Sequence, residues 1–240
     1  MGFLNNISIM ARLVACFGLL AVVILVVGGV NYHGMSQINR ESEKVISSAP
    51  LIDTAMRMKM AIRSQQLHIM EMLSSEDRGE MESFWQASQA QKGELAALIV
   101  KMHGILNEQS RQLAGKQVID QLKKLLTDVE HVHDHLLMKR VEQVHDLVLL
   151  GFSSSIQSDA VAAKRHSLDT EADANAEEII VLLDEVEHVG WNIQNSALTG
   201  TSQASNSATL ASLVVIVGGL VLALAPIFHK IKGRILVYSI

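Results

Sequence analysis

Arg63 lies among apolar residues that share one face of a predicted helix. Ile52, Met56, Leu67 and Met70 recur at helical spacing, and Arg63 falls between them on the same face. A guanidinium in an apolar seam is costly unless it is paired, and its planar fork suits a carboxylate. Two interpretations follow. Arg63 pairs with an acidic residue inside the bundle or a dimer seam, or it captures an anionic ligand.

Two other polar residues are candidates to assist Arg63. Lys59 precedes it by one helical turn. Asn175 lies on a later predicted helix, at about the same number of residues from an apolar span as Arg63. We therefore predict a ligand-binding site made of Arg63, Lys59 and Asn175, in which Arg63 anchors an anionic group.

The ten histidines are a second signal, because several cluster on one helix. His131 and His135 are four residues apart, so their rings can converge on one metal ion, and Glu142 is predicted to share their face. Such a site could hold Zn²⁺, Ni²⁺ or Cu²⁺. The alternatives are a solvated polar face or a surface that responds to pH. His133, by contrast, is predicted to point towards the core as a hydrogen-bonded histidine.

Helical periodicity runs through the middle of the chain, and strand-like alternation is absent. The breaks at residues 74–79, 107–110 (or at Gly115) and 151–155 divide it into four amphipathic helices. Pro50 should kink the first helix or begin a new turn. The core stripes predicted on the other three helices are Phe84, Ser88, Gln91, Leu95, Leu98, Met102 and Ile105; Leu122, Leu125, Val129, Val132, Leu136, Val144 and Leu147; and Val161, Leu168, Ala172, Ile179, Leu183, Val186, Ile193 and Ala197.

Two apolar spans flank this region, at residues 13–30 and 208–228, and each is about long enough to cross a bilayer. The only charged residues outside residues 31–207 are Arg12, Lys230, Lys232 and Arg234, all basic. Basic residues near span ends stay preferentially in the cytoplasm. We therefore expect a multi-pass protein of the bacterial inner membrane, with residues 1–12 and 229–240 cytoplasmic and residues 31–207 forming a periplasmic domain.

The composition narrows the classes of function. Residues 31–207 carry 16 Lys and Arg against 25 Asp and Glu, and such an acidic domain argues against nucleic acid as a partner. The single cysteine, Cys16, lies in the first span, which rules out a disulfide within the domain and a thiolate zinc site. No nucleophile–base pair or glycine-rich phosphate loop occurs. We expect no enzyme and no cofactor other than a possible divalent metal.

The order of a span, a long helix, two shorter helices, a long helix and a span resembles the sensory half of bacterial methyl-accepting chemotaxis receptors. The Ala/Ser/Asn-rich run at residues 195–211, which leads into the second span, adds to the resemblance, which covers about residues 8–228. It implies an all-α fold: an antiparallel four-helix bundle whose helices 1 and 4 continue into two transmembrane helices. It also implies a homodimer that binds a small ligand, or a loaded binding protein, and shifts helix 4 with the second span.

The resemblance ends near Phe228, after which twelve residues remain. Family members continue into a linker and a cytoplasmic hairpin that couples to a kinase, so we expect the cytoplasmic signalling partner to lie outside this chain. The chain would then be a fragment, a truncated product or a partner for another chain. The alternatives are the input domain of a histidine kinase, a metal-binding bundle anchored in the membrane, and a purely structural bundle.

Overall fold

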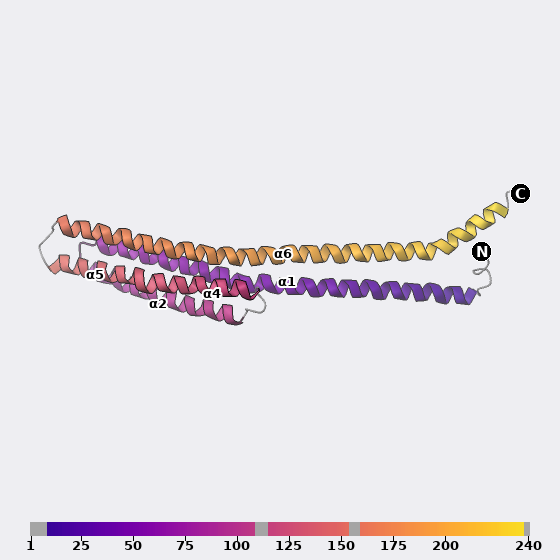
Figure 1. The fold of residues 1–240 in the computed structure, drawn as a ribbon, viewed down its shortest axis with the longest axis horizontal. Helices are drawn as coiled ribbons and strands as arrows, with labels where there is room; N and C mark the ends of the chain where they lie inside the picture. The colour runs from indigo at the N-terminus through magenta and orange to yellow at the C-terminus, as the bar shows by residue number, and fades with distance from the viewer. Residues whose placement is uncertain (1–8, 109–114, 154–158, 238–240) are drawn as a thin grey trace. The chain divides into compact units, whose positions relative to one another are not determined.

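A computed structural model describes residues 9–108, 115–153 and 159–237, and these are almost entirely helical. No strand occurs within those ranges. The helices are α1 (Ile9–Ser74), α2 (Arg78–Glu108), α4 (Lys116–His131), the π-helical segment η2 (Val132–Leu137), α5 (Met138–Ser153) and α6 (Asp159–Val237) (Figure 1). Because α4, η2 and α5 follow without a break, they form the third of four helices.

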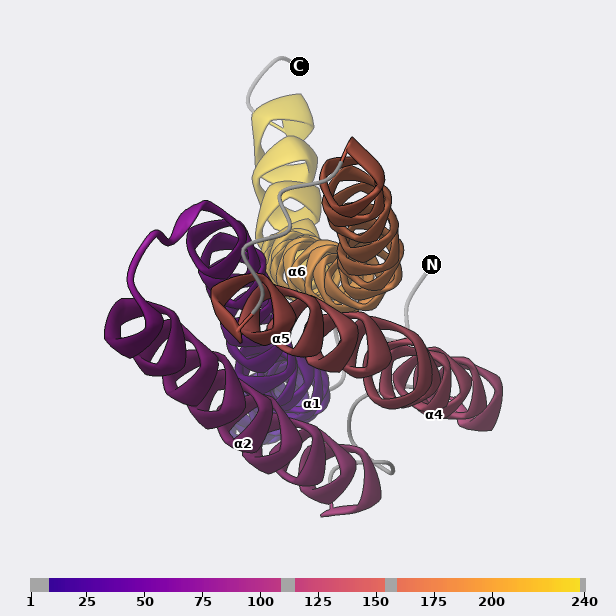
Figure 2. The ribbon, with the colours of Figure 1, turned by 90° about the vertical axis from the view of Figure 1, so that its left-hand side faces the viewer.

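The predicted antiparallel four-helix bundle is confirmed. Its compact unit comprises Glu43–Ser196, and successive helices run in opposite directions within it (Figures 1 and 2). Its core is aliphatic and rich in methionine, as the helical periodicity predicts. Residues that are completely inaccessible to solvent come from all four helices, among them Leu51, Met58, Ile62, Leu95, Val129, Val141, Ala176, Ile179 and Leu183.

The predicted turns fall at the helix ends where the structure describes them, but the helices extend one to three residues further into each turn than predicted. α1 ends at Ser74 and α2 begins at Arg78. The side chain of Asp77, just before α2, accepts a hydrogen bond from the backbone N–H of Glu80. Gly115 precedes α4 in an extended conformation. Residues 109–114 and 154–158, on which parts of the second and third turns fall, lie outside the described residues. Pro50 starts no new helix, because α1 continues through it.

Two of the predicted stripes need correction. On α1, Met56, Leu67 and Met70 are about half exposed, whereas Ile62 and Ile69 face the core. The part of the predicted seam that contains Arg63 is therefore an outer face of the bundle unit, whereas Ile52, from the same seam, is buried as predicted. Both faces of α1 are apolar, so hydropathy alone does not choose between them.

The second correction concerns Leu136, which was predicted to pack in the core and is 37% exposed. Its neighbour Leu137 is completely buried instead. Leu136 lies in the π-helical segment η2, whose wider turn changes which residues face inward. Most of the α2 and α6 stripe positions are buried as predicted, namely Ser88, Leu95, Leu98, Met102, Ile105, Leu168, Ala172, Ile179, Leu183, Val186, Ile193 and Ala197.

The second compact unit comprises Met1–Ser42 and Ala197–Ile240. In its described part, the N-terminal portion of α1 packs closely against the C-terminal portion of α6. A Cβ added to Gly34 would lie 2.7 Å from the Cβ of Ala208, and one added to Gly219 would lie 2.8 Å from a methyl group of Val23. Small residues therefore set the approach of the two helices in this unit.

Two of the described helices, α1 and α6, are long and apolar enough to cross a membrane. Only 6% of each apolar window is buried, which is unlike the core helix of a soluble domain. Large apolar side chains such as Phe17, Ile24 and Leu213 are more than half exposed. The predicted spans at residues 13–30 and 208–228 fall within these two helices.

Candidate functional site

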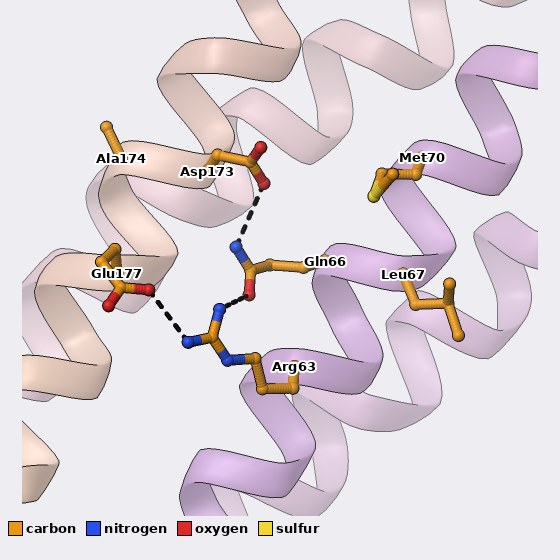
Figure 3. Close-up of a pocket in the computed structure, with 7 residues that line it drawn as sticks. All are labelled: Arg63, Gln66, Leu67, Met70, Asp173, Ala174 and Glu177. Atoms are coloured by element: carbon orange, nitrogen blue, oxygen red, sulfur yellow. Dashed lines mark hydrogen bonds and ion pairs between the residues drawn. The ribbon is translucent and has the colours of Figure 1, made fainter.

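A pocket of about 630 Å³ opens between α1 and α6 of the bundle unit (Figure 3). The two helices contribute four polar or charged side chains and three apolar ones. The lining residues are Arg63, Gln66, Leu67, Met70, Asp173, Ala174 and Glu177. A pocket with apolar walls and a few convergent polar groups is the usual form of a small-molecule site.

A chain of polar contacts crosses this pocket from α6 to α1 and back to α6. A terminal nitrogen of Arg63 lies 3.0 Å from a carboxylate oxygen of Glu177, and the other donates to the Gln66 amide oxygen, also at 3.0 Å. The Gln66 amide nitrogen in turn donates to Asp173 at 3.1 Å. Figure 3 shows the four side chains in this order. Arg63 is therefore already paired with an acidic residue of its own bundle.

Lys59 lies one turn before Arg63 and bridges two carboxylates of α6. Its ammonium donates to Asp184 at 2.7 Å and also to Glu187. Burial acts to lower the pKa of Lys59, but the hydrogen bonds and the attraction from Asp184 and Glu187 outweigh it, so the pKa is raised above its ordinary 10.5. Lys59 contributes to α1–α6 pairing and does not line the pocket.

Asn175, the third residue of the predicted ligand site, is half-buried on α6 and is not among the lining residues. The structure thus brings Arg63 to the pocket and leaves Lys59 and Asn175 beside it. Sequence reasoning missed Asp173 and Glu177. The sequence contains a pattern that could have identified them, because Asp169, Asp173 and Glu177 recur every four residues on one face of α6.

Asp169 extends this acidic row beyond the pocket. Burial raises the pKa of Asp169 above its ordinary 3.8, repulsion from Asp173 raises it further, and attraction to His166 acts in the opposite direction. One oxygen of Asp169 is buried and has no hydrogen-bond partner among the described residues. Asp169, Asp173 and Glu177 therefore form an acidic row on α6 in which only Asp169 has its pKa clearly raised.

The predicted histidine pair lies elsewhere, on the third helix. The rings of His131 and His135 have centroids 5.1 Å apart, and both residues are exposed, as is Glu142. Within the described ranges, no three His, Cys, Asp or Glu side chains lie close enough to hold a metal ion. Metal binding by His131, His135 and Glu142 stays a prediction.

His133 points into the core as predicted and is 2% exposed. Its Nε2 lies 3.2 Å from the amide oxygen of Gln65 on α1, and its Nδ1 lies 2.8 Å from a carboxylate oxygen of Asp134. Burial lowers the pKa of His133 below 6.5, the contact with Asp134 acts in the opposite direction, and the charge of Lys92 lowers it further. His133 and Gln65 form a small polar cluster in a mostly apolar interior.

The comparison with protein families decides the classification. The model of the four-helix-bundle sensory module for signal transduction matches residues 6–152, which is more than half of the 240-residue chain. The chain belongs to this family. The chain itself matches none of the curated proteins and none of the solved structures. A family of signal-transduction modules agrees with the expectation of a sensor and is not a family of enzymes.

Proposed function

We propose that this sensory module is the input half of a chemoreceptor-type transmembrane receptor. It binds a small extracytoplasmic ligand at the α1–α6 pocket and relays a helix displacement through the second span. One observation carries the proposal. α6 runs as one helix from Asp159 to Val237, so the same helix supplies the pocket residues Asp173 and Glu177 and the second candidate span. Membership of a signal-transduction family supports this role.

The relay works by a shift between two packings of α1 against α6. A ligand moves such an equilibrium only if it binds one packing more tightly than the other. The contacts from Glu177 through Arg63 and Gln66 to Asp173 join α1 to α6. A ligand that replaces one of these contacts therefore changes the relative stability of the two packings. Exposed ion pairs of this kind are weak, and a small ligand can therefore compete with them.

The lining residues limit the charge of the ligand. The pocket has one guanidinium, from Arg63, and two carboxylates, from Asp173 and Glu177. An anionic group that binds Arg63 competes with Glu177, and the carboxylate released in this way can pair with an amine on the same ligand. We infer a ligand that carries an acidic group for Arg63, an amine for Asp173 and Glu177, and an apolar part against Leu67 and Met70.

The test is calorimetry and thermal unfolding of the full chain in lipid nanodiscs with a panel of amino acids and organic acids. A ligand at 100 times its Kd stabilises the folded state by about 2.7 kcal/mol. We expect wild type to be stabilised and Arg63→Ala not to be. Arg57→Ala is the matched control, since Arg57 pairs with Asp53 on α1 itself and does not line the pocket. Equal stabilisation of the Arg63 variant would refute the site.

The proposed membrane is the bacterial inner membrane, with the bundle on its periplasmic side. All four charged residues outside residues 31–207 are basic, and they flank the outer ends of the two apolar spans. Basic residues in these positions favour a cytoplasmic location for both termini. Labelling of single cysteines with a membrane-impermeant reagent in intact cells, in a Cys16→Ser background, tests this orientation. A cysteine at exposed Glu108 should react, and protection there would contradict it.

A second copy of the chain is the proposed partner of the outer face of α1. Met56, Met60, Leu67 and Met70 are 48%, 71%, 52% and 54% exposed, and they lie on the helix that also carries Arg63. Apart from Arg63, which lies between them, these residues form an apolar stripe of the kind typical of a helix that packs against another chain. A dimer along it would bring two pockets close to the interface.

The dimer is tested by the mass of the full chain in nanodiscs or detergent, measured by sedimentation. Met60→Glu should shift the protein towards monomer, because it places a charge in the stripe. Val100→Glu on α2 is the matched control, since Val100 is also 71% exposed but lies on another helix. If both variants retain the oligomeric state of wild type, the interface does not lie on this face of α1.

A further inference from the structure

The third helix of the bundle contains a π-helical turn, η2, which has a cause in the sequence. The buried positions Val129, His133, Leu137 and Val141 follow one another at intervals of four. On a regular α-helix each such step turns the stripe by about 40°, so three steps would carry it out of the core. The wider turn of a π-helix takes up one extra residue. It returns the stripe to the core, where Val144 and Val148 are completely buried.

Gln65 of α1 holds both ends of this turn. Its amide oxygen lies 3.2 Å from Nε2 of His133, and its amide nitrogen donates to the sulfur of Met138 at 2.9 Å. Gln65 is only 1% exposed, and its neighbours on the same face, Ile62 and Ile69, are buried as well. A buried amide without hydrogen-bond partners lowers the stability of the fold, and these two contacts offset that cost for Gln65.

The two contacts are compatible with only one local helix form. His133 and Met138 are five residues apart, and on an α-helix such residues point about 140° away from each other. In a π-helix, residues five apart are the hydrogen-bonded pair and lie on one face. Gln65 can therefore contact both residues only while η2 keeps its π-helical turn.

We propose that Gln65 is a register latch, which holds the third helix in the π-helical one of two registers against α1. In the other register residues 132–137 are regular α-helix, and α5 is rotated relative to α4. A movement of α1 that withdraws Gln65 releases the turn. The latch residues are buried and do not line the α1–α6 pocket, and the operation of the latch does not depend on which ligand the pocket takes.

The first test is hydrogen exchange of the full chain in nanodiscs, read over residues 132–138. Gln65→Leu should speed exchange there by about tenfold, which corresponds to the loss of one or two hydrogen bonds. Ser88→Ala is the control, because it also removes a buried polar group from the core but lies on α2, which contributes no residue to the latch. Unchanged exchange in the Gln65 variant would overturn the proposal.

A second variant separates the latch from ordinary packing. Deletion of Leu136, the residue that η2 turns out of the core, should convert η2 to regular α-helix. His133 and the present Met138 would then be four residues apart and could still both face Gln65. We expect an unchanged or raised Tm and slower exchange over the turn. Deletion of Glu94 from α2, which has no π-helical turn, should destabilise the bundle strongly. Equal destabilisation by both deletions would also overturn the proposal.

Discussion

Arg63 and Glu177 lie 3.0 Å apart across the α1–α6 pocket, and both side chains are 56% exposed. The pair connects the two helices that also contain the candidate membrane spans. Its exposure has an energetic consequence, because exposed ion pairs in water contribute little to folding. The pair is therefore better suited to exchange partners with a ligand than to hold the bundle together.

The first prediction separates ligand response from stability at this pair. Arg63→Ala and Glu177→Gln should each change the free energy of unfolding by less than about 1 kcal/mol. Glu177→Gln should increase the affinity for an organic acid that has no amine, because Arg63 no longer has a competing carboxylate beside it. Denaturant titration and calorimetry measure the two quantities. A large loss of stability in either variant would mean that the pair is structural.

The second prediction concerns Lys59, which contacts two carboxylates and is only 23% exposed. Lys59→Met should lower the free energy of unfolding by about 1–3 kcal/mol, because Asp184 and Glu187 lose a charged hydrogen-bond donor. Lys59→Arg, which keeps the charge, should lower the free energy of unfolding by less than Lys59→Met does. Urea unfolding of the full chain in detergent micelles measures both changes.

The same contact predicts a dependence on alkaline pH. The pKa of Lys59 is raised in the folded state, so its contribution is complete below 10.5 and is lost as the pH rises through the folded-state pKa. The difference between wild type and Lys59→Met should therefore shrink at high pH. A difference that stays constant across that range would contradict the assigned role of the ammonium.

The third prediction is that Asp169→Asn stabilises the protein at neutral pH. The pKa of Asp169 is raised by burial and by Asp173, so its charged form is disfavoured in the folded state. This penalty is present above the folded-state pKa and vanishes as the pH falls below 3.8, where the carboxyl is protonated in both states. Thermal unfolding at neutral pH and at a pH below 3.8 should show that Asp169→Asn has a higher Tm than wild type only at neutral pH. Asp120→Asn, at an exposed site on α4, should leave the Tm unchanged.

The fourth prediction concerns the close approach of α1 and α6 at Gly190. A Cβ added there would lie 2.7 Å from Cγ1 of Ile52 and 2.9 Å from a methyl of Leu51, both of which are buried. Gly190→Ala should therefore destabilise the bundle, although alanine favours a helix over glycine by about 1 kcal/mol. Gly93→Ala is the matched control, because nothing lies within 4 Å of its added Cβ. Gly93→Ala should stabilise α2. Denaturant titration should therefore show a lower free energy of unfolding for Gly190→Ala and a higher one for Gly93→Ala.

The sequence by itself determined the features that depend on local spacing. Helical periodicity and polar loop residues such as Ser75 predict the four helices, the two apolar spans, the approximate ends of α1 and α2, and most of the α2 and α6 core positions. These properties arise within a few turns of one helix. They need no knowledge of which helices pack together, and His133 was placed in the core on the same basis.

Only the tertiary structure decided the features that depend on a second helix. α1 has two apolar faces, and Ile62 packs inward while Met56 does not, because the rest of the bundle covers one face only. The pairing of Arg63 with Glu177 depends on how α1 and α6 align over a separation of more than one hundred residues. The π-helical turn likewise has a partner in Gln65 that no local pattern identifies, since it lies on another helix.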